Sequence, residues 1–152
     1  MQHSDDYYMA LALAEARKAG DRAEVPIGAV LVHSQTGQIF SGGNNTITAA
    51  DPTAHAEIEV IRRACLHEEA QRIPNYELYV TLEPCAMCTA AISFARIRRV
   101  VFGAHDPKGG GILHGGRFYE QPTCHHKPET AYMPNEECST ILKSFFAARR
   151  GR

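Results

Sequence analysis

The stretch Glu77-Leu-Tyr-Val-Thr-Leu-Glu-Pro-Cys-Ala-Met-Cys88 joins a predicted strand to a predicted helix. Residues 77–82 form a short run rich in apolar and β-branched side chains, which favours a buried strand. A helix is predicted from about Cys85 to Ala95. Cys85 and Cys88 are three residues apart in its first turn, so both sulfur atoms can face the same point. Two cysteines in this arrangement are the first indication of a metal site.

A second short motif, His55-Ala56-Glu57, also lies where a predicted helix begins. A stripe of apolar residues predicts this helix over residues 53–70, with Thr53 or Asp51 as its start signal. His55 supplies a third ligand, and three protein ligands with an open fourth position are typical of a catalytic zinc. Glu57 is not counted as a ligand and is the candidate proton shuttle. Positions 55 and 57 point apart on an ideal helix, so they converge only if the metal lies off the helix end.

The rest of the chain predicts an α/β fold. A helix is expected from near Ser4 to Gly20, strands over 27–32 and 38–41 form a hairpin, and another strand covers 99–102. A hairpin followed by alternating helices and strands predicts a mixed sheet with helices on both faces. Residues 105–134 show no clear period, and a loop this long is usually functional or wrongly assigned. The last helix is predicted from about Asn135 to Arg150, with four apolar side chains directed inward: Ile141, Leu142, Phe145 and Phe146. Either Phe145 or Phe146 can instead lie at the edge of the substrate site.

Length and composition narrow the class of protein. The chain has 152 residues, of which 44% are hydrophobic, so residues 1–152 are expected to form a single domain. The formal net charge of -1 provides no global basic field, so any contact with nucleic acid must rest on local patches. Five cysteines are an odd number, which favours metal binding or catalysis in a reducing compartment over a disulfide framework. With no apolar run of about 20 residues and no signal peptide, a cytoplasmic protein without a membrane segment is expected.

The two motifs are specific only in combination. Alone, the His-x-Glu motif fits a solvated helix start, and the Cys-x-x-Cys motif fits two core cysteines. In this order, each at the start of a helix, they form the established signature of zinc-dependent nucleobase deaminases. The predicted reaction replaces a ring amino group with oxygen, using water that the metal activates.

Longer stretches resemble the bacterial tRNA-specific adenosine deaminases of the cytidine/deoxycytidylate deaminase superfamily, which convert the wobble adenosine of an anticodon to inosine. The zinc motifs alone specify the wider superfamily, whereas the block 78–88 and the Phe-Phe-x-x-Arg-Arg ending indicate the tRNA branch. The resemblance covers most of residues 7–150. The similar stretches are 24–32, 51–58, 78–88, 97–106 and 145–150.

The resemblance implies a three-layer α/β/α sandwich with a mixed five-stranded sheet, and a homodimer whose partner subunit helps to form the tRNA surface. It implies one zinc per subunit, held by His55, Cys85 and Cys88, with Glu57 as proton shuttle. It also implies two substrate contacts: Asn44 to the flipped adenine, and Asp106 to the neighbouring nucleotide of the anticodon stem-loop. The chain departs from the best-known members between Lys108 and Pro134, where Gly-rich and Cys-His-His runs replace a helix-forming stretch.

The end of the chain carries a local cluster of positive charge. No acidic residue follows Glu137, so this cluster suits contacts with phosphate, although cations in a last helical turn also complement the helix dipole. Arg149 and Arg150 are the candidate substrate-binding residues within it. The cations of the cluster are Lys143, Arg149, Arg150 and Arg152.

Two other interpretations of the function remain open on the sequence. The same chemistry suits a deaminase of a free base or nucleoside, such as guanine or cytosine. A catalytically inactive zinc protein is a third reading, against which the intact Glu57 argues. The run Cys124-His125-His126 suggests a second metal site, but adjacent residues chelate one ion poorly, and a polar loop or subunit contact explains the run better. Cys65 and Cys138 lie on apolar helix stripes and are expected to be core thiols.

Overall fold

The structure is a computed structural model, and it describes residues 3–150. Its elements alternate between helix and strand, as the sequence predicts. In chain order the elements are α1 (Asp5–Asp21), β1 (Gly28–His33), β2 (Ile39–Gly43), α2 (Ala56–Glu68), β3 (Tyr76–Val80), α3 (Ala86–Phe94), β4 (Arg99–Phe102), the 3-10 helix η1 (Phe118–Glu120), β5 (Glu129–Tyr132) and α4 (Glu136–Arg150).

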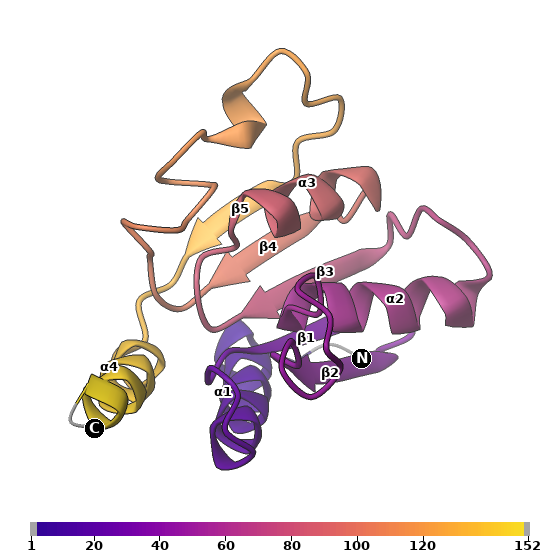
Figure 1. Ribbon diagram of the computed structural model, residues 1–152. Helices are drawn as coiled ribbons and strands as arrows, with labels where there is room; N and C mark the ends of the chain where they lie inside the picture. The colour runs from indigo at the N-terminus through magenta and orange to yellow at the C-terminus, as the bar shows by residue number, and fades with distance from the viewer. Residues whose placement is uncertain (1–2, 151–152) are drawn as a thin grey trace.

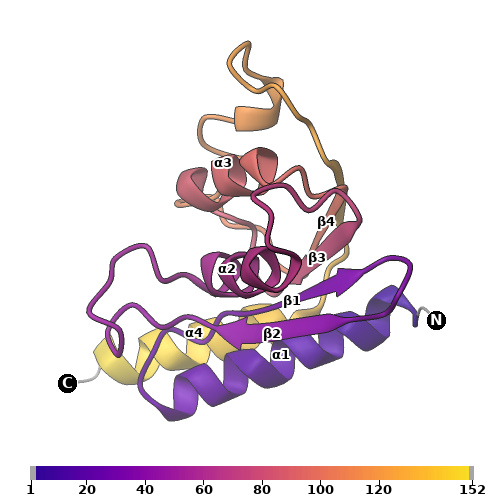
Figure 2. The same ribbon diagram turned by 90° about the vertical axis from the view of Figure 1, so that its right-hand side faces the viewer.

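The strands form one mixed five-stranded sheet in the order β2-β1-β3-β4-β5. β1 lies antiparallel to both β2 and β3, whereas β3, β4 and β5 are parallel to one another. α2 and α3 cover one face of the sheet, and α1 and α4 lie on the other (Figures 1 and 2). Each face has its own apolar core, so the predicted three-layer α/β/α sandwich is confirmed.

α1 begins and packs as its sequence predicts. Ser4 is the N-cap and accepts a hydrogen bond from the backbone N–H of Tyr7 at 3.2 Å. The helix then lies directly against β1, because Gly28 has no side chain: a Cβ atom there would lie 1.9 Å from the carbonyl oxygen of Ala12. This close approach fixes the start of β1, and Val25 and Ile27, just before it, line the pocket described below.

The fifth strand lies in the stretch for which the sequence shows no period. β5 is an edge strand whose side chains are mostly exposed, so the apolar alternation that identifies a half-buried strand is absent. The connection from β4 to β5 is also unusual. A parallel crossover is commonly a helix, but here it is a long loop that contains only η1, and it lies over α3 (Figure 1).

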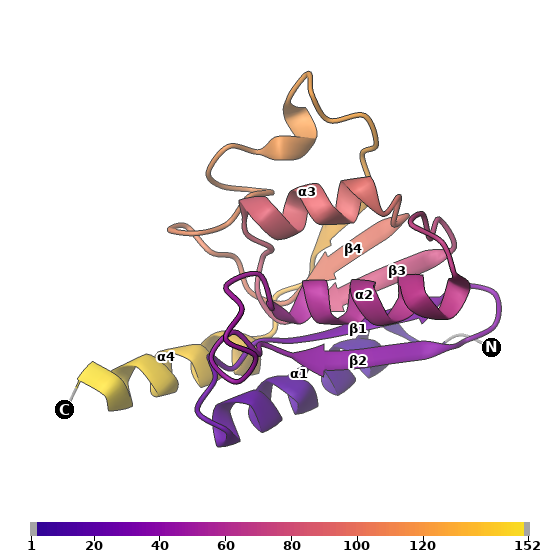
Figure 3. The same ribbon diagram turned by 45° about the vertical axis from the view of Figure 1, so that its right-hand side comes forward.

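α4 differs from its prediction in what it buries. Asn135 caps it as expected, with its side-chain oxygen accepting the backbone N–H of Glu137 at 3.0 Å. Cys138 is buried and Ile141 packs against the same core, but Phe146 is 43% exposed and lines a groove, so of its two predicted places the core is wrong. The helix runs beside α1 and its C-terminal part extends beyond the sheet (Figure 3), and there Leu142 and Phe146 line a groove. None of the described helices is both long and apolar enough to cross a membrane.

Candidate active site

His55 and Cys85 are the N-cap residues of α2 and α3, and neither side chain caps its own helix. The predicted start signals of α2 are therefore wrong. Asp51 instead accepts hydrogen bonds from the backbone N–H and the hydroxyl of Thr53, at 2.8 and 2.7 Å, in the turn before the helix. Because this turn positions the chain before the helix, the imidazole is available to face α3.

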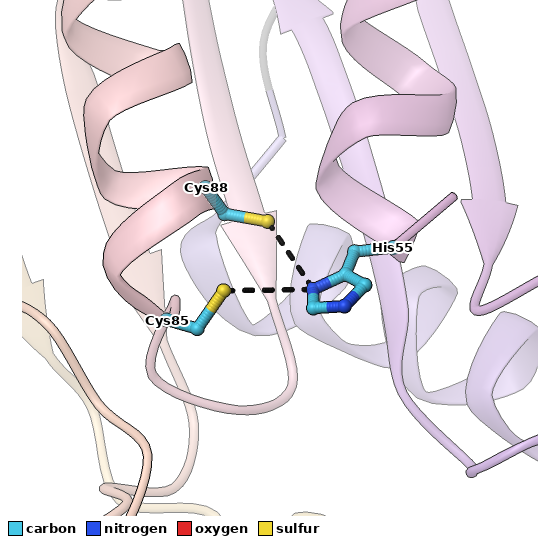
Figure 4. Close-up of side chains that lie close together, drawn as sticks. All are labelled: His55, Cys85 and Cys88. Atoms are coloured by element: carbon cyan, nitrogen blue, oxygen red, sulfur yellow. Dashed lines mark hydrogen bonds between the residues drawn. The ribbon is translucent and has the colours of Figure 1, made fainter. Parts of the chain in front are cut away.

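Figure 4 shows His55, Cys85 and Cys88 pointing toward one another. Nδ1 of His55 lies 3.5 Å from each of the two sulfur atoms. Tetrahedral zinc, with bonds of about 2.3 Å to sulfur and 2.05 Å to nitrogen, requires a separation of about 3.6 Å between such atoms. All three ligand atoms lie within 4.8 Å of one another, so the group fits one tetrahedral zinc ion.

The thiols differ strongly in their readiness to ionise. A hydrogen bond from the Cys88 thiol, together with the neighbouring His55, lowers the pKa of Cys85 to about 4 despite partial burial. The pKa of Cys88 is raised, because its thiol donates that hydrogen bond to Cys85 and is itself buried. The hydrogen bond with Cys85 raises the pKa of His55. A divalent cation between them would favour the thiolate form of both cysteines.

Glu57 lies in the first turn of α2 and its side chain is buried, with 4% of the residue exposed. Burial raises the pKa of this carboxyl to about 7, because a charge is costly to remove from water, and the nearby Cys85 thiolate adds to the effect. A carboxyl group with such a pKa can both accept and release a proton near neutral pH.

A pocket of about 260 Å³ opens beside this group. Asn44 and Asp106, predicted from the family resemblance, both line it. Asn44 comes from the segment after β2, and Asp106 comes from the loop after β4. The structure therefore brings both residues to the same cavity. The lining residues are Val25, Ile27, Asn44, Thr46, His55, Ala56, Glu57, Leu82, Glu83, Cys85, Asp106 and Gly109.

Two buried carboxylates that the sequence reasoning did not single out support the walls of the pocket. Glu24 accepts a hydrogen bond from Nδ2 of Asn44 at 3.3 Å and from the backbone N–H of Thr48 at 2.7 Å. Burial opposes ionisation of Glu24, but the hydrogen bonds from Thr48 and Ile47 and the charge of Arg22 hold its pKa below the ordinary value. The other carboxylate is Glu83. Both glutamates lie next to apolar stretches of the sequence. A charged residue beside a buried apolar stretch is the signal by which the sequence could have indicated a buried carboxylate.

The two C-terminal arginines occupy different environments. Arg150 lines a groove of about 610 Å³ that adjoins the pocket and shares Asp106 with it, and Lys143 lines the same groove. Arg149 points elsewhere: its guanidinium donates to the carbonyl of Ala23 at 3.2 Å and lies 4.1 Å from the ring centre of Phe145. Arg152 lies outside the described residues.

The remaining cysteines have structural surroundings. Within residues 3–150, the only group of three candidate ligands is that of His55, Cys85 and Cys88. Cys124 instead donates to the carbonyl oxygen of His126 at 3.1 Å, so it helps to fix the crossover loop. Cys138 is fully buried, as expected of a core thiol, and Cys65 is partly buried against the core between α2 and the sheet.

The fold and this group of side chains define a class, the zinc-dependent deaminases. The family described as the cytidine and deoxycytidylate deaminase zinc-binding region matches residues 2–104. The tRNA-specific adenosine deaminase of Agrobacterium fabrum is 55% identical over 146 residues, which are 95% of this chain and 95% of that protein. The chain therefore belongs to the cytidine and deoxycytidylate deaminase family, in the group of the tRNA-specific adenosine deaminases.

Solved structures support the same placement. One, from a study of A-to-I editing by tRNA:A34 deaminases at the wobble position of transfer RNA, is 55% identical with a TM-score of 0.86, over 90% of this chain and 99% of that one. A guanine deaminase from Bacillus subtilis is 30% identical with a TM-score of 0.65, over 99% of this chain and 95% of that one. Both identity and fold similarity are thus greater for the tRNA deaminase.

Proposed function

We propose that this protein catalyses the hydrolytic deamination of the wobble adenosine in a tRNA anticodon loop to inosine, with release of ammonia. One observation carries the proposal: the His55, Cys85 and Cys88 group opens onto a pocket that also holds the buried carboxyl of Glu57. The 55% identity to a tRNA-specific adenosine deaminase over nearly the whole chain supports the choice of substrate.

His55, Cys85 and Cys88 would hold one zinc ion per subunit. When bound, the ion supplies Lewis-acid activation of a water molecule for attack on C6 of adenine. Glu57 would take a proton from the attacking water molecule and deliver a proton to the departing amine. A bond from C6 to oxygen forms, the bond from C6 to nitrogen breaks, and ammonia leaves. The raised pKa of Glu57, about 7, suits a group that must perform both proton transfers.

Asn44 and Asp106 are the proposed substrate contacts. The target base must leave its stack to enter a pocket of about 260 Å³. Hydrogen bonds from Nδ2 of Asn44 to Glu24 and Thr46, at 3.3 and 3.4 Å, fix the orientation of the amide that faces this base. Asp106 lines both the pocket and the adjoining groove, which suits contact with the neighbouring nucleotide.

The wider partners follow from the surface. Lys143 and Arg150 in the groove offer positive charge to backbone phosphates of the anticodon stem-loop. Leu66 on α2 and Phe94 on α3 are 79% and 66% exposed, and such apolar side chains on one layer suit a second subunit in a homodimer. We propose that residues 1–152 form a single domain. We also propose that the protein acts in the cytoplasm, together with its tRNA substrate.

The alternative function is deamination of a free base. The 30% identity to a guanine deaminase structure supports this alternative. One experiment distinguishes the tRNA deaminase from the free-base deaminase. The purified protein is incubated with an adenosine-containing anticodon stem-loop and, separately, with guanine, cytosine and adenosine. We expect inosine from the stem-loop and far slower reaction of the free compounds, because only the stem-loop offers contacts to flanking nucleotides. Rapid turnover of guanine or cytosine beside an unreacted stem-loop would reject the proposal.

A further inference from the structure

We infer that Glu83 is a positioning residue for substrate binding, whose buried carboxylate holds the loop of residues 105–114 as one wall of the pocket. This inference rests on the proposed function for its substrate, an anticodon stem-loop. We call residues 105–114 the wall loop. It contains Asp106 and Gly109, which line the pocket.

The carboxylate of Glu83 is bound by the wall loop from both sides. Its side chain is fully buried. One oxygen, Oε1, accepts the backbone N–H of Asp106 at 3.0 Å. The other oxygen, Oε2, accepts three successive backbone N–H groups. They belong to Ile112 at 3.0 Å, Leu113 at 2.8 Å and His114 at 3.2 Å. Successive N–H groups that converge on one oxygen form an anion-binding concavity, so the buried charge is satisfied by the loop alone.

The glycine run of the wall loop has a physical reason in this contact. A Cβ atom at Gly110 would lie 2.3 Å from the carboxyl group of Glu83, so a side chain cannot be accommodated there without moving the loop. The backbone N–H of Gly111 also donates to the carbonyl of Pro84 at 2.8 Å. The loop therefore lies directly along the segment that leads to the metal ligand Cys85.

The two ends of the wall loop also meet. Nδ1 of His105 lies 3.0 Å from Nε2 of His114, which closes the loop around the carboxylate. Glu83 itself borders the pocket, but the loop occupies both of its oxygen atoms. It is therefore suited to placing Asp106 against a substrate rather than to transferring a proton. We expect it to determine how well the stem-loop binds and not how fast the bound base reacts.

Glu83→Gln tests this directly. The amide offers one oxygen and an NH2 group, so it cannot accept hydrogen bonds from both sides of the wall loop. KM for the stem-loop should rise about tenfold, because hydrogen bonds to a buried charge are lost. The turnover number should stay within about twofold, as expected when only uniform binding is removed, and zinc should remain at one per subunit.

Glu77→Gln is the matched control. Glu77 lies on β3, is also a buried carboxylate although 9% of the residue is exposed against 2% for Glu83, and has Arg99 at 3.7 Å, away from the pocket. It should leave KM for the stem-loop unchanged. A lower turnover number at unchanged KM, a loss of zinc, or unchanged kinetics in Glu83→Gln would each overturn the inference.

Gly110→Ala provides a second variant that keeps the carboxylate and displaces the loop. It should raise KM in the same way with zinc retained, and an unchanged KM would contradict the inference. Hydrogen exchange gives a readout that needs no substrate: the amides of residues 112–114 should lose protection in Glu83→Gln while those of α2 and α3 keep it. If the wild-type protein does not deaminate the stem-loop, the proposed function fails, and the exchange result still decides whether Glu83 holds the loop. Unchanged protection at 112–114 would show that it does not.

Discussion

His55 and Cys85 occupy the same position in two different helices, the N-cap, and their side chains meet with Nδ1 3.5 Å from Sγ. The N-terminal ends of α2 and α3 thus point to one place. A helix N-terminus favours negative charge, so two of them stabilise the thiolates that a zinc ion requires. Positions 55 and 57 point apart on an ideal helix. Because the metal group lies beyond the N-terminal end of α2, the side chains of His55 and Glu57 can nevertheless both face it.

Replacing Cys88 with alanine should remove the metal. The remaining two ligands cannot hold zinc at the affinity of a three-ligand site, so the zinc content should fall from one per subunit to near zero after dialysis against metal-free buffer. Elemental analysis measures this. Cys124→Ala is the control and should retain full zinc, because its thiol donates to the carbonyl of His126 instead. Full zinc in the Cys88 variant together with loss in the Cys124 variant would reject the ligand assignment.

Replacing Glu57 with glutamine should separate chemistry from binding. The amide is nearly the same size and cannot carry the proton, so turnover should fall by about 10²- to 10⁴-fold. Zinc content and affinity for the stem-loop should stay near those of the wild-type protein, because Glu57 is not part of the group that could hold the metal. Single-turnover kinetics with a stem-loop provide the rate. Turnover close to that of the wild-type protein would remove Glu57 from the reaction.

The sequence predicts most of the fold because its core elements are strongly patterned. The strand at 99–102 and the helix that Ser4 caps lie where apolar runs and a capping residue place them. β5 was not predicted, because the side chains of an exposed edge strand do not alternate between apolar and polar. Phe146 was expected inside because helical spacing gives the apolar face of α4 but does not reveal that the helix extends beyond the sheet.

The candidate site divides in the same way. The metal group is predictable, since the residue types and spacing of His55, Cys85 and Cys88 are set by zinc chemistry. The contacts that support the pocket walls are not predictable from the sequence. Glu24 and Glu83 accept hydrogen bonds from backbone N–H groups of distant loops, and every residue type except proline has such a group. The family resemblance implies that Asn44 and Asp106 contact the substrate, and the structure shows that both line the pocket and that Glu24 and Glu83 hold them.

Arg150 and Arg149 should differ in their effect on RNA binding. Arg150 lines the groove beside the pocket, so Arg150→Ala should weaken stem-loop binding and reduce the slope of log K against log salt by about one. Arg149 is engaged with Ala23 and Phe145, so Arg149→Ala should change that slope less. Fluorescence titrations of a labelled stem-loop at several salt concentrations measure both. A larger effect for Arg149 would contradict the placement of α4 beside the substrate.

Asp5 should make stability depend on pH in the acid range. The hydrogen bond from Arg99 has the largest effect on the pKa of Asp5 and lowers it. Burial opposes this effect, the hydrogen bond from Tyr79 adds to it, and the resulting pKa is about 2. The folded pKa is below the ordinary value of about 4, so the carboxylate stabilises the fold above pH 4 and this contribution is lost as the pH falls toward 2. Asp5 is partly exposed, so Asp5→Asn should cost about 1 kcal/mol at pH 7.

Urea unfolding between pH 7 and pH 2 tests this linkage. The difference in unfolding free energy between the wild-type protein and Asp5→Asn should shrink as the pH falls through this range. Asp6→Asn, a change at an exposed neighbour in the same helical turn, is the control for removing one negative charge from this turn. A difference for Asp5→Asn that stays constant down to pH 2 would show that the ion pair with Arg99 does not control it.

The most direct test of the central claim is to follow the oxygen atom. The protein is incubated with an anticodon stem-loop containing adenosine at the wobble position, in water labelled with ¹⁸O, and the digested RNA is analysed by mass spectrometry. Hydrolytic deamination predicts inosine that carries one ¹⁸O atom, with one ammonia released per inosine, and Glu57→Gln should yield almost none. Unlabelled inosine, or an unchanged stem-loop under conditions in which the protein converts free guanine to xanthine, would contradict the account.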